Sequence, residues 1–597
     1  MTDDASMPVK PICFYLPQFH AIPENDAWWG KRFTEWSLVK AATPQFATHR
    51  QPREPIAELG YYDLLDSDVR RRQGEIARAH GVYGFCYYHY WFDGKRLLER
   101  PLEKMLTDGE PDLPFCLCWA NEPWSRRWDG SDQEVLQAQN YGDAAGWDAH
   151  FNCLLRFFEH PNYIRVQGRP LLVVYRLGDI DDGPAMIDAW RRRAESAGLP
   201  GLHLVAALNH QAPDAQQLAA VDAACEFLPN YLYPQERMRI RRFGILGLQC
   251  AEEGWRGTLS LPKAHRVQYR GVFRSWDNTP RFRDRGVVTI DSDTATFRAL
   301  LDRQFQRAAT DPDLPEPFVF VNSWNEWGEG TYLEPDREHG FSWLETLRDA
   351  VQNTAATSST DAPAISARIL ETTDGFRGPD EIFGVLLRGQ IRAGRLLAVE
   401  CGDGSTARTI SQFLRAGHCT GIDRDASVIP AASRRLDVAC LLDFETTTPD
   451  AIPGKTEPFD ILIALCCLER VREPGEVLRT WATAVRPGGH VLLSVPNVQN
   501  LRVLTSIVEG DWRYADGGPV EPQQVRFFSM KSLDRLLDGA GLERMATQAR
   551  FDPVLDGGQL KSAGNTVSVG RLTIRDLSAG DVRRLHASHY MILARRT

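Results

Sequence analysis

The sequence predicts an α/β protein with two domains, an N-terminal (β/α)8 TIM barrel followed by a doubly wound, Rossmann-like sheet. Three observations predict this fold class. The chain has 597 residues, more than one ordinary hydrophobic core accommodates. Apolar strand-like runs alternate with helical patterns about eight times before residue 350, as a barrel requires. The same alternation restarts near residue 395, with a Gly-containing turn after its first strand.

The domain boundaries follow from composition. We expect the barrel over residues 8–352 and a linker rich in Thr, Ser and Ala over residues 353–372. The second domain is expected over residues 373–550, with a C-terminal extension over residues 551–597. For the first domain, a doubly wound open sheet is the competing topology.

The predicted barrel elements are short apolar runs and amphipathic stretches between them. The strands are expected at residues 12–16, 82–90, 115–119, 171–175, 202–208, 225–228, 267–273 and 318–321. Helical patterns between them include residues 66–80, 147–160, 184–198 and 296–309.

Composition and charge exclude several classes of protein. A net charge of −10 and a pI near 5.8 argue against nucleic-acid or anionic-membrane partners. The N-terminus lacks an apolar signal segment, and no apolar run approaches the roughly 18 residues of a membrane span. The 12 cysteines lie mostly inside apolar runs, which is typical of reduced core residues in a cytoplasmic protein. Cys116 and Cys118 could form a metal pair, but no second pair has zinc spacing, so no metal is expected.

The eighth predicted strand ends in a distinctive polar stretch. Between Asn322 and Glu329 the chain carries two amides, two indoles and two carboxylates, with Gly328 inside this stretch. Glu326 and Glu329, crowded on a Gly-containing turn and partly desolvated, would not ionise together readily. One acid and one base result, the pair that cleavage of a glycosidic bond requires. The alternative is a surface turn with solvated glutamates and core tryptophans.

Similar polar and aromatic clusters follow most of the other predicted strands. One rim of the barrel is therefore expected to be an aromatic cleft with carboxylates, which is typical of carbohydrate sites. Phosphate or nucleotide sites would instead show Gly-rich loops and lysines. The candidate substrate-binding residues are His20, Trp36, His89, Trp119, Asn121, Glu122, Tyr231, Trp276, Trp324, Asn325, Trp327 and Tyr332.

Some of these candidates have structural alternatives. His20 and His89 could bind sugar hydroxyls or act as acid or base, or make a structural hydrogen bond near the rim. Glu122 could contact substrate, or form a salt bridge to Arg126 or Arg127.

Several motifs of the first domain carry a family resemblance. They are Tyr15-Leu-Pro-Gln-Phe-His20, Phe33-Thr-Glu-Trp36, Cys118-Trp-Ala-Asn-Glu122, Ser275-Trp-Asp-Asn-Thr-Pro280 and Trp324-Asn-Glu-Trp-Gly-Glu-Gly-Thr331. Over nearly all of residues 8–350 the chain resembles the WbsX family of bacterial O-antigen and surface-polysaccharide contexts, whose members have been called glycosyltransferases. The domain is also similar to glycoside hydrolase family 99, the endo-α-mannosidase-like barrels.

The resemblance to family 99 implies roles for both glutamates. Glu326 would take the proton from the sugar 2-hydroxyl, which attacks its own anomeric carbon to give a 1,2-anhydro sugar. Glu329 would protonate the leaving oxygen and then activate the incoming nucleophile, either water or another sugar. Arg32 stands where the family usually has Gly, which leaves the two carboxylates untouched.

The second domain resembles class I S-adenosylmethionine-dependent methyltransferases over about residues 380–547. The resemblance rests on the turn after its first strand, Asp423, Asp443 and Arg486-Pro-Gly-Gly489, in that order. It implies that Gly402 and Gly404 line the methionine moiety of S-adenosylmethionine, that Asp423 binds the ribose and that Asp443 lies at the adenine edge.

The second domain also departs from that family. Ala398 replaces the usual acid of the first strand, and Glu400 replaces the first glycine of the turn. Glu400 could invert the local charge or bind the ligand's amino group in place of the missing acid. Leu468-Glu469-Arg470 stands where the family often has Leu-Glu-His. Active methyl transfer and a degenerate, structural or ligand-sensing domain both stay open.

Together these features predict a cytoplasmic protein of surface-polysaccharide metabolism. The barrel would act on a mannose-like glycan or a lipid-linked oligosaccharide, and the second domain would O-methylate a glycan with S-adenosylmethionine as cofactor. The alternative is a glycan-binding barrel with an inactive glutamate pair and a degenerate methyltransferase domain.

Overall fold

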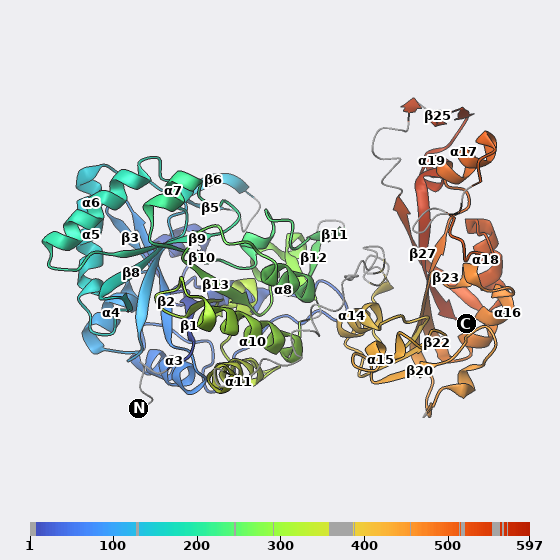
Figure 1. Ribbon diagram of the computed structural model, residues 1–597, viewed down its shortest axis with the longest axis horizontal. Coiled ribbons are helices and arrows are strands. Elements are labelled where there is room, and N and C mark those ends of the chain that lie inside the picture. Colours follow the sequence, from blue (N-terminus) through green and yellow to red (C-terminus); the bar gives the residue numbers. More distant parts are fainter. Residues whose placement is uncertain are drawn as a thin grey trace. The chain divides into compact units, whose positions relative to one another are not determined.

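The computed structural model describes residues 7–126, 131–243, 246–290, 292–357, 382, 386, 389–453, 455–512, 514, 520–551, 561–563, 566–569 and 571–597 (Figure 1). The chain divides into two compact units, residues 1–45 with 50–375 and residues 46–49 with 376–597. Each unit is described by itself.

The first unit is a closed barrel of eight parallel strands. Each strand pairs with the next one along the chain, and the last pairs with the first, so the predicted (β/α)8 barrel is confirmed. The barrel strands are β1 Lys10–Tyr15, β2 Gly84–Phe92, β4 Phe115–Trp119, β8 Arg169–Val174, β9 His203–Leu208, β10 Ala223–Glu226, β13 Gln268–Phe273 and β15 Phe318–Asn322.

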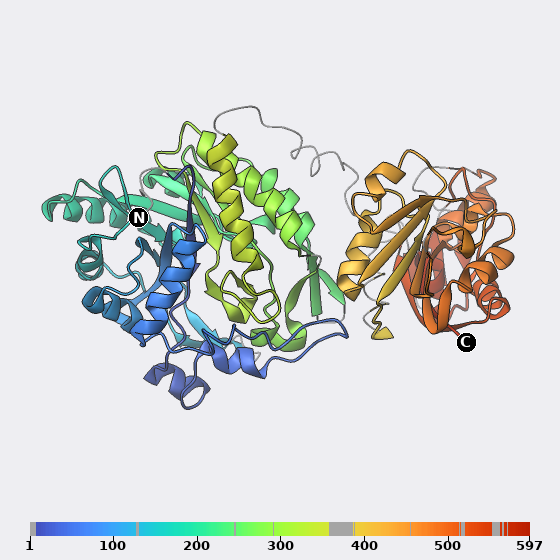
Figure 2. The same ribbon diagram turned by 90° about the horizontal axis from the view of Figure 1, so that it is seen from below.

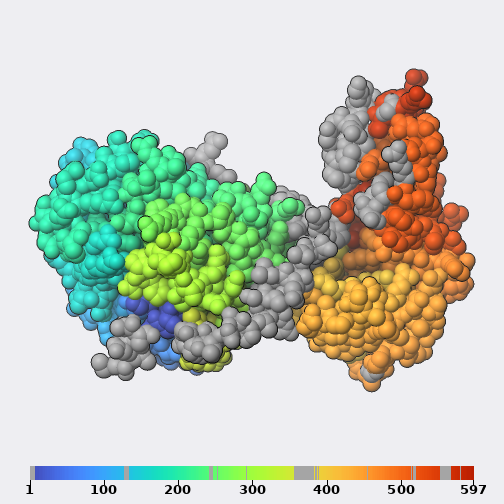
Figure 3. Space-filling model, viewed as in Figure 1, coloured from blue at the N-terminus to red at the C-terminus, as the bar shows by residue number. Residues whose placement is uncertain are grey.

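Helices cover the outside of the barrel. Among them, α10 and α11 pack side by side, as the two ribbon views show (Figures 1 and 2). In the space-filling view these two helices form the yellow-green surface of the first unit (Figure 3). The outer helices are α3 Ser67–Ala79, α4 Arg100–Asp108, α5 Ala144–Phe158, α6 Gly183–Ser196, α7 Ala215–Ala220, α8 Ala251–Leu259, α10 Thr294–Thr310 and α11 Ser342–Thr357.

Local chemistry explains where these helices begin. The Asp143 carboxylate accepts hydrogen bonds from the first-turn amides of α5, and Asp293 does the same for α10. Such caps satisfy amide groups that have no partner within the helix. α11 extends to Thr357, past the predicted end of the barrel, and residues 358–372 of the predicted linker lie outside the described residues.

The barrel strands are buried on both faces. All residues of β4 and β9 are buried, which is why parallel strands read as continuous apolar runs in a sequence. Cys13, Cys86, Cys116, Cys118 and Cys225 are free thiols in this core, in agreement with the expected core role of the cysteines.

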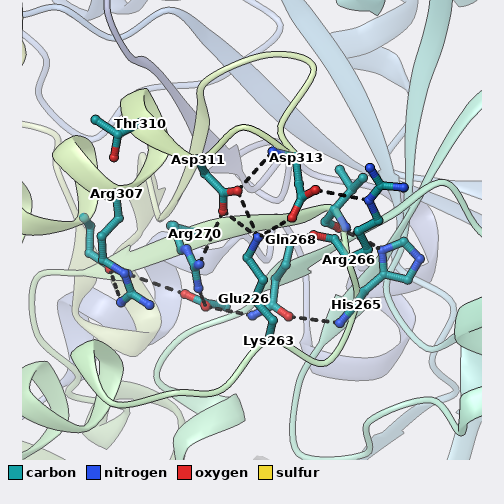
Figure 4. A network of polar contacts seen from close by, with 12 residues as sticks. Glu226, Lys263, His265, Arg266, Gln268, Arg270, Arg307, Thr310, Asp311 and Asp313 are labelled. Carbon is teal, nitrogen blue, oxygen red and sulfur yellow. Dashed lines mark hydrogen bonds and ion pairs between the residues drawn. The ribbon is translucent and has the colours of Figure 1, made fainter.

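A polar network ties β10 and β13 to the loop that follows α10 (Figure 4). The guanidinium of Arg270 lies 3.2 Å from the buried Glu226 carboxylate and 3.6 Å from Asp311. Lys263 Nζ lies 2.7 Å from Asp311 and 3.2 Å from Asp313. None of these five residues lines the cavity described below, so the network serves the fold.

The second unit contains a seven-stranded sheet in the order β20-β19-β18-β21-β22-β27-β23. The first five of these strands are parallel, whereas β27 runs antiparallel between β22 and β23. The end of the predicted C-terminal extension, residues 551–597, thus forms a strand inside the sheet. The strands are β18 Arg395–Val399, β19 His418–Asp423, β20 Val438–Leu441, β21 Phe459–Leu465, β22 Val485–Pro496, β23 Leu542–Phe551 and β27 Ala587–Arg596.

Helices lie between these strands, as the Rossmann-like prediction requires. A separate three-stranded sheet comprises β24 Lys561–Ala563, β25 Thr566–Val569 and β26 Leu572–Ile574. In the parts of the chain that the structure describes, no helix combines the length and apolar character needed to cross a bilayer. The helices are α14 Ser405–Leu414, α15 Ile429–Ala432, α16 Pro474–Ala482, α17 Leu501–Glu509, α18 Met530–Gly539 and α19 Ala579–His586.

Candidate functional site

A cavity of about 480 Å³ lies at the carboxyl ends of the barrel strands, the usual place for an active site in this fold. Leu16, Ala120, Tyr175 and Phe227, which follow β1, β4, β8 and β10, line it. Its ionisable wall consists of four carboxylates and two arginines. They are Glu122, Asp179, Glu326, Glu329, Arg176 and Arg281.

Glu326 and Glu329 lie on a small hairpin after β15. The hairpin consists of β16 Asn325–Glu326, the single turn η6 Trp327–Glu329 and β17 Thr331–Tyr332. The Asn325 amide accepts a hydrogen bond from Leu16 N (2.8 Å) and donates one to Leu16 O (3.0 Å). Ser323 Oγ accepts from Glu326 N at 2.9 Å. The hairpin is therefore fastened to the end of β1, and both carboxylates line the same cavity.

Two glycines of this hairpin are sites of close approach. Gly330 has φ +63°, and a Cβ on it would lie 2.7 Å from Asp277 Cβ. Asp277 N donates to Glu329 O at 2.6 Å, and Arg53 holds the Asp277 carboxylate at 3.0 Å. A Cβ on Gly328 would lie 1.7 Å from Glu35 Oε1, so only glycine fits there.

Arg281 is the central residue that the sequence did not reveal. It lies on the short helix α9 Thr279–Phe282, and its Nη2 is 2.8 Å from Glu35 Oε1 and 2.5 Å from Glu326 Oε1. Its Nη1 is 2.6 Å from Glu329 Oε1. One signal could have found it: Arg281 directly follows the Ser275–Pro280 motif, and two buried acids need a cation nearby.

Burial governs the protonation of the pair. It raises the pKa of Glu326, while Arg281 lowers this pKa and Glu329 and Glu35 raise it further. Burial likewise raises the pKa of Glu329, Arg281 lowers it, and Glu35 and Glu122 raise it. Both groups therefore hold a proton to higher pH than an exposed glutamate does.

Glu122 lines the cavity as a member of an ion pair. Its partner is Arg176, which follows β8. The alternative predicted a salt bridge from Glu122 to Arg126 or Arg127. The partner Arg126 is wrong, because Arg126 lies 2.9 Å from Glu134 instead. Arg127 lies outside the described residues.

Four of the predicted sugar-binding aromatic residues are instead buried and do not line the cavity. Trp327 and Tyr332 are stacked with ring centroids 3.8 Å apart, and Trp327 Nε1 donates to Glu334 Oε2 at 2.7 Å. The Trp36 ring lies 5.4 Å from that of Trp327, and Trp324 is fully buried. The apolar surface of these four residues therefore packs in the core and is not available to a sugar ring in the cavity.

The two histidines are also buried away from the cavity. His20 Nδ1 lies 2.9 Å from Pro17 O, and burial lowers the pKa of His20 to about 4. His89 Nε2 lies 3.1 Å from His150 Nε2, and burial lowers the pKa of His89 to about 3. Both are thus neutral core residues at pH 7, as in the structural alternative.

The remaining predicted residues support the rim without lining the cavity. Asn121 joins the ends of β4 and β8, since its amide accepts from Arg176 N (2.7 Å) and donates to Arg176 O (2.9 Å). Trp119 Nε1 donates to the backbone at 3.2 Å, and Tyr231 and Trp276 are buried. Asn325 is used by the hairpin contact to β1.

A different aromatic set lines the cavity. Tyr88 and Tyr90 flank His89 on β2, and side chains alternate along a strand. The alternation sends the two tyrosines inward and His89 outward, a signal that the strand prediction already contained. The other aromatic residues of the wall are Trp29, Trp124, Tyr175, Phe227 and Phe282.

In the second unit, the predicted cofactor residues gather at the carboxyl ends of β18, β19 and β20. Gly402 has φ +55°, Gly404 has φ +81°, and a Cβ on Gly402 would meet only open space. Gly402 N donates to Asp423 Oδ2 at 2.8 Å. Asp443 follows β20 and is half-buried. This open, Gly-containing turn beside an acid fits the ribose and methionine moieties of S-adenosylmethionine.

Glu400 adopts a left-handed conformation with φ +52°, where glycine is the usual residue. Its Oε1 lies 3.3 Å from Arg424 Nε. Burial raises the pKa of Glu400, Arg424 lowers it, and Asp423 and Asp443 raise it. Glu400 thus adds a carboxylate to the turn beside Asp423, and Arg424 offsets part of its negative charge.

Comparisons with known proteins agree with this division. Residues 11–347 match the family model described as Glycosyltransferase WbsX, and residues 374–547 match one described as Methyltransferase domain. "Uncharacterized protein WxcX" of Xanthomonas campestris pv. campestris (strain B100) is 40% identical over 352 residues, which cover 58% of this chain and 50% of that protein. The chain thus spans about half the length of the curated relatives that it matches first.

Two further likenesses are more distant. "Ubiquinone biosynthesis O-methyltransferase" of Marinobacter nauticus is 27% identical over 201 residues, which cover 32% of this chain and 84% of that protein. A solved structure, the GH99 endo-alpha-mannosidase from Bacteroides thetaiotaomicron, is 14% identical with a TM-score of 0.37, covering 60% of this chain and 100% of that one. A TM-score of 0.37 is too low to support a conclusion about the fold or function of this chain.

Proposed function

Because the chain belongs to the WbsX glycosyltransferase family and carries a methyltransferase domain behind it, we propose that its barrel makes or breaks glycosidic bonds through Glu326 and Glu329. The proposed substrate is a mannose-like glycan or lipid-linked oligosaccharide of bacterial surface polysaccharide, handled in the cytoplasm. The observation that carries this proposal is the convergence of the buried Glu326 carboxylate and the half-buried Glu329 carboxylate on one guanidinium at the wall of an aromatic cavity.

The two glutamates suit opposite tasks. Glu326 takes the proton of the sugar 2-hydroxyl while that oxygen attacks the anomeric carbon. Glu329 gives its proton to the leaving oxygen as the glycosidic bond breaks. Glu329 then accepts the proton of the incoming water or sugar hydroxyl, which opens the 1,2-anhydro ring, and Glu326 returns its proton to the 2-oxygen. The raised pKa of Glu329 favours the protonated form that the leaving oxygen requires, and the raised pKa of Glu326 makes its carboxylate a stronger base once ionised.

The cavity wall favours a glycan over a nucleotide sugar as glycosyl donor. Arg176 is paired with Glu122, and Arg281 is paired with three carboxylates. No lysine is among the described lining residues. A diphosphate group would therefore meet mostly acids, whereas tyrosine and tryptophan rings suit the apolar faces of sugar rings.

For the second unit we propose O-methylation of a glycan. Gly402 and Gly404 would hold the methionine moiety of S-adenosylmethionine, Asp423 the ribose and Asp443 the adenine edge, while Glu400 would face the amino group. When bound, this cofactor supplies an electrophilic methyl group. The observation that favours the other candidate, a ligand-binding domain without methyl transfer, is the pair of departures at Ala398 and Glu400.

One experiment tests all of these proposals. The protein is incubated with synthetic α-mannosides and O-antigen fragments, with and without S-adenosylmethionine, and the products are read by mass spectrometry. We expect loss or gain of a glycosyl unit, and gain of a methyl group only with the cofactor. Glu326→Gln and Glu329→Gln should each abolish the glycosyl change, whereas the exposed Glu58→Gln should not. A wild-type protein that leaves every glycan unchanged would favour the glycan-binding alternative.

A further inference from the structure

We propose that Glu35 and Arg281 form a clamp of positioning residues, which fixes the geometry of Glu326 and Glu329 and sets how many protons this pair holds. The inference rests on the proposed function of the two glutamates and deepens it. Neither clamp residue was among the sequence-derived candidates.

The clamp joins three segments far apart in the chain. Glu35 is the first residue of α2 Glu35–Ala41, and 246 positions separate it from Arg281. Arg281 Nε donates a hydrogen bond to Glu35 (2.8 Å), Nη2 donates to Glu326 (2.5 Å), and Nη1 donates to Glu329 (2.6 Å). One planar, rigid group therefore sets the spacing of the two carboxylates.

Glu35 has little freedom to move. It is fully buried, and its backbone N donates to Gln18 O at 3.0 Å. The backbone of Gly328 passes so close that a Cβ there would lie 1.7 Å from Glu35 Oε1 and 2.9 Å from Arg281 Nε. The turn that carries Glu329 is thus built directly against the clamp.

Charge count gives the clamp its second role. Three carboxylates surround one guanidinium, so full ionisation would leave two uncompensated negative charges in a buried site. Glu35 uses part of the positive charge of Arg281 and adds a negative charge of its own. As a result, Glu35 favours retention of a proton by the pair, whereas Arg281 favours its loss.

Other groups face the pair and stay constant in the test. They are Glu122 after β4, the phenols of Tyr88 and Tyr90 on β2, Tyr175 after β8, and Tyr233, which follows η4 Asn230–Leu232. Of these groups, Tyr90 also responds to the clamp, since Arg281 lowers its pKa and Glu35 raises it. The titration must therefore follow the glutamate signals themselves.

The test compares Glu35→Gln, Arg281→Gln and Arg281→Lys in the full chain. The protein is labelled with ¹³C at the glutamate carboxyl carbon and titrated by NMR, with Glu326→Gln and Glu329→Gln to assign the signals. We expect Glu35→Gln to lower the apparent pKa values of the pair and Arg281→Gln to raise them, each by about tenfold or more in proton affinity. Arg281→Lys should restore the pKa values but not kcat, because an ammonium cannot reproduce the three-way fork.

Opposite shifts support the clamp, whereas unchanged values or shifts in the same direction would overturn it. If Arg281→Gln does not fold, Glu35→Gln decides the question by its titration, since a merely structural Glu35 would leave the pKa values of the pair unchanged. Arg281→Lys is judged by its kcat, which should fall although its titration matches the wild type. Opposite pKa shifts in the two variants, with no wild-type activity on any glycan, would refute the proposed function but support the clamp. Wild-type activity on a glycan, with pKa values that do not shift in the variants, would support the proposed function but refute the clamp.

Discussion

Gly328→Ala should inactivate the barrel although it replaces no ionisable side chain. A Cβ at this position would lie 1.7 Å from Glu35 Oε1 and 2.9 Å from Arg281 Nε. Ordinary contacts between carbon and oxygen are about 3.3 Å or longer, so Glu35 or the turn must move by about 1.6 Å. The turn carries Glu329, and Arg281 contacts the carboxylates of both Glu326 and Glu329, so the movement reaches the two groups proposed to react.

The size of the effect follows from that displacement. A misplacement of about 1 Å can cost roughly 100-fold in rate, so we expect kcat/KM on a cleaved or transferred glycan to fall by about 100-fold or more. Most of the loss should be in kcat, since the aromatic wall that holds the sugar is unchanged.

The assay is steady-state turnover of the best glycan substrate, with thermal unfolding measured in parallel. Gly183→Ala is the matched control, because a Cβ there meets its nearest neighbours at an ordinary 3.6 Å. Retention of kcat within twofold by a folded Gly328→Ala protein would refute the reasoning, since the turn would then not depend on the clamp.

Three further predictions concern stability and the second unit. Burial raises the pKa of Glu334 to about 7 in the folded protein, above the value in the unfolded chain. Protonated Glu334 therefore stabilises the fold fully below about pH 4.5, and this stabilisation is lost as the pH rises through 7. Between pH 5 and 8, the free energy of unfolding measured with urea should therefore fall by up to about 3 kcal/mol more in the wild type than in Glu334→Gln. An equal pH dependence in the two proteins would contradict this prediction. Glu226→Gln leaves the buried Arg270 without its main partner and should cost about 3 kcal/mol of unfolding free energy, whereas Glu58→Gln should cost almost none. Glu400→Gly removes a residue with φ +52° and should raise the stability of the second unit by about 1 kcal/mol while weakening S-adenosylmethionine binding in calorimetry. Unchanged binding would exclude Glu400 from the cofactor site.

The sequence by itself determined the architecture and led to the prediction of Glu326 and Glu329 as an acid and base pair. Parallel strands buried on both faces leave continuous apolar runs in the chain, so each predicted barrel strand corresponds to an observed strand. Glu326 and Glu329 were recognisable because their chemistry is concentrated in one short stretch.

Only the tertiary structure decided which aromatic rings face the cavity and which cation serves the pair. Tyr88 and His89 are neighbours in sequence, yet strand alternation places one in the cavity wall and the other in the core. Glu35 and Arg281 meet across 246 positions, and no local pattern encodes such a contact. It arises when the barrel closes, since closure brings separate loops to one rim and buries like charges that then require a shared partner.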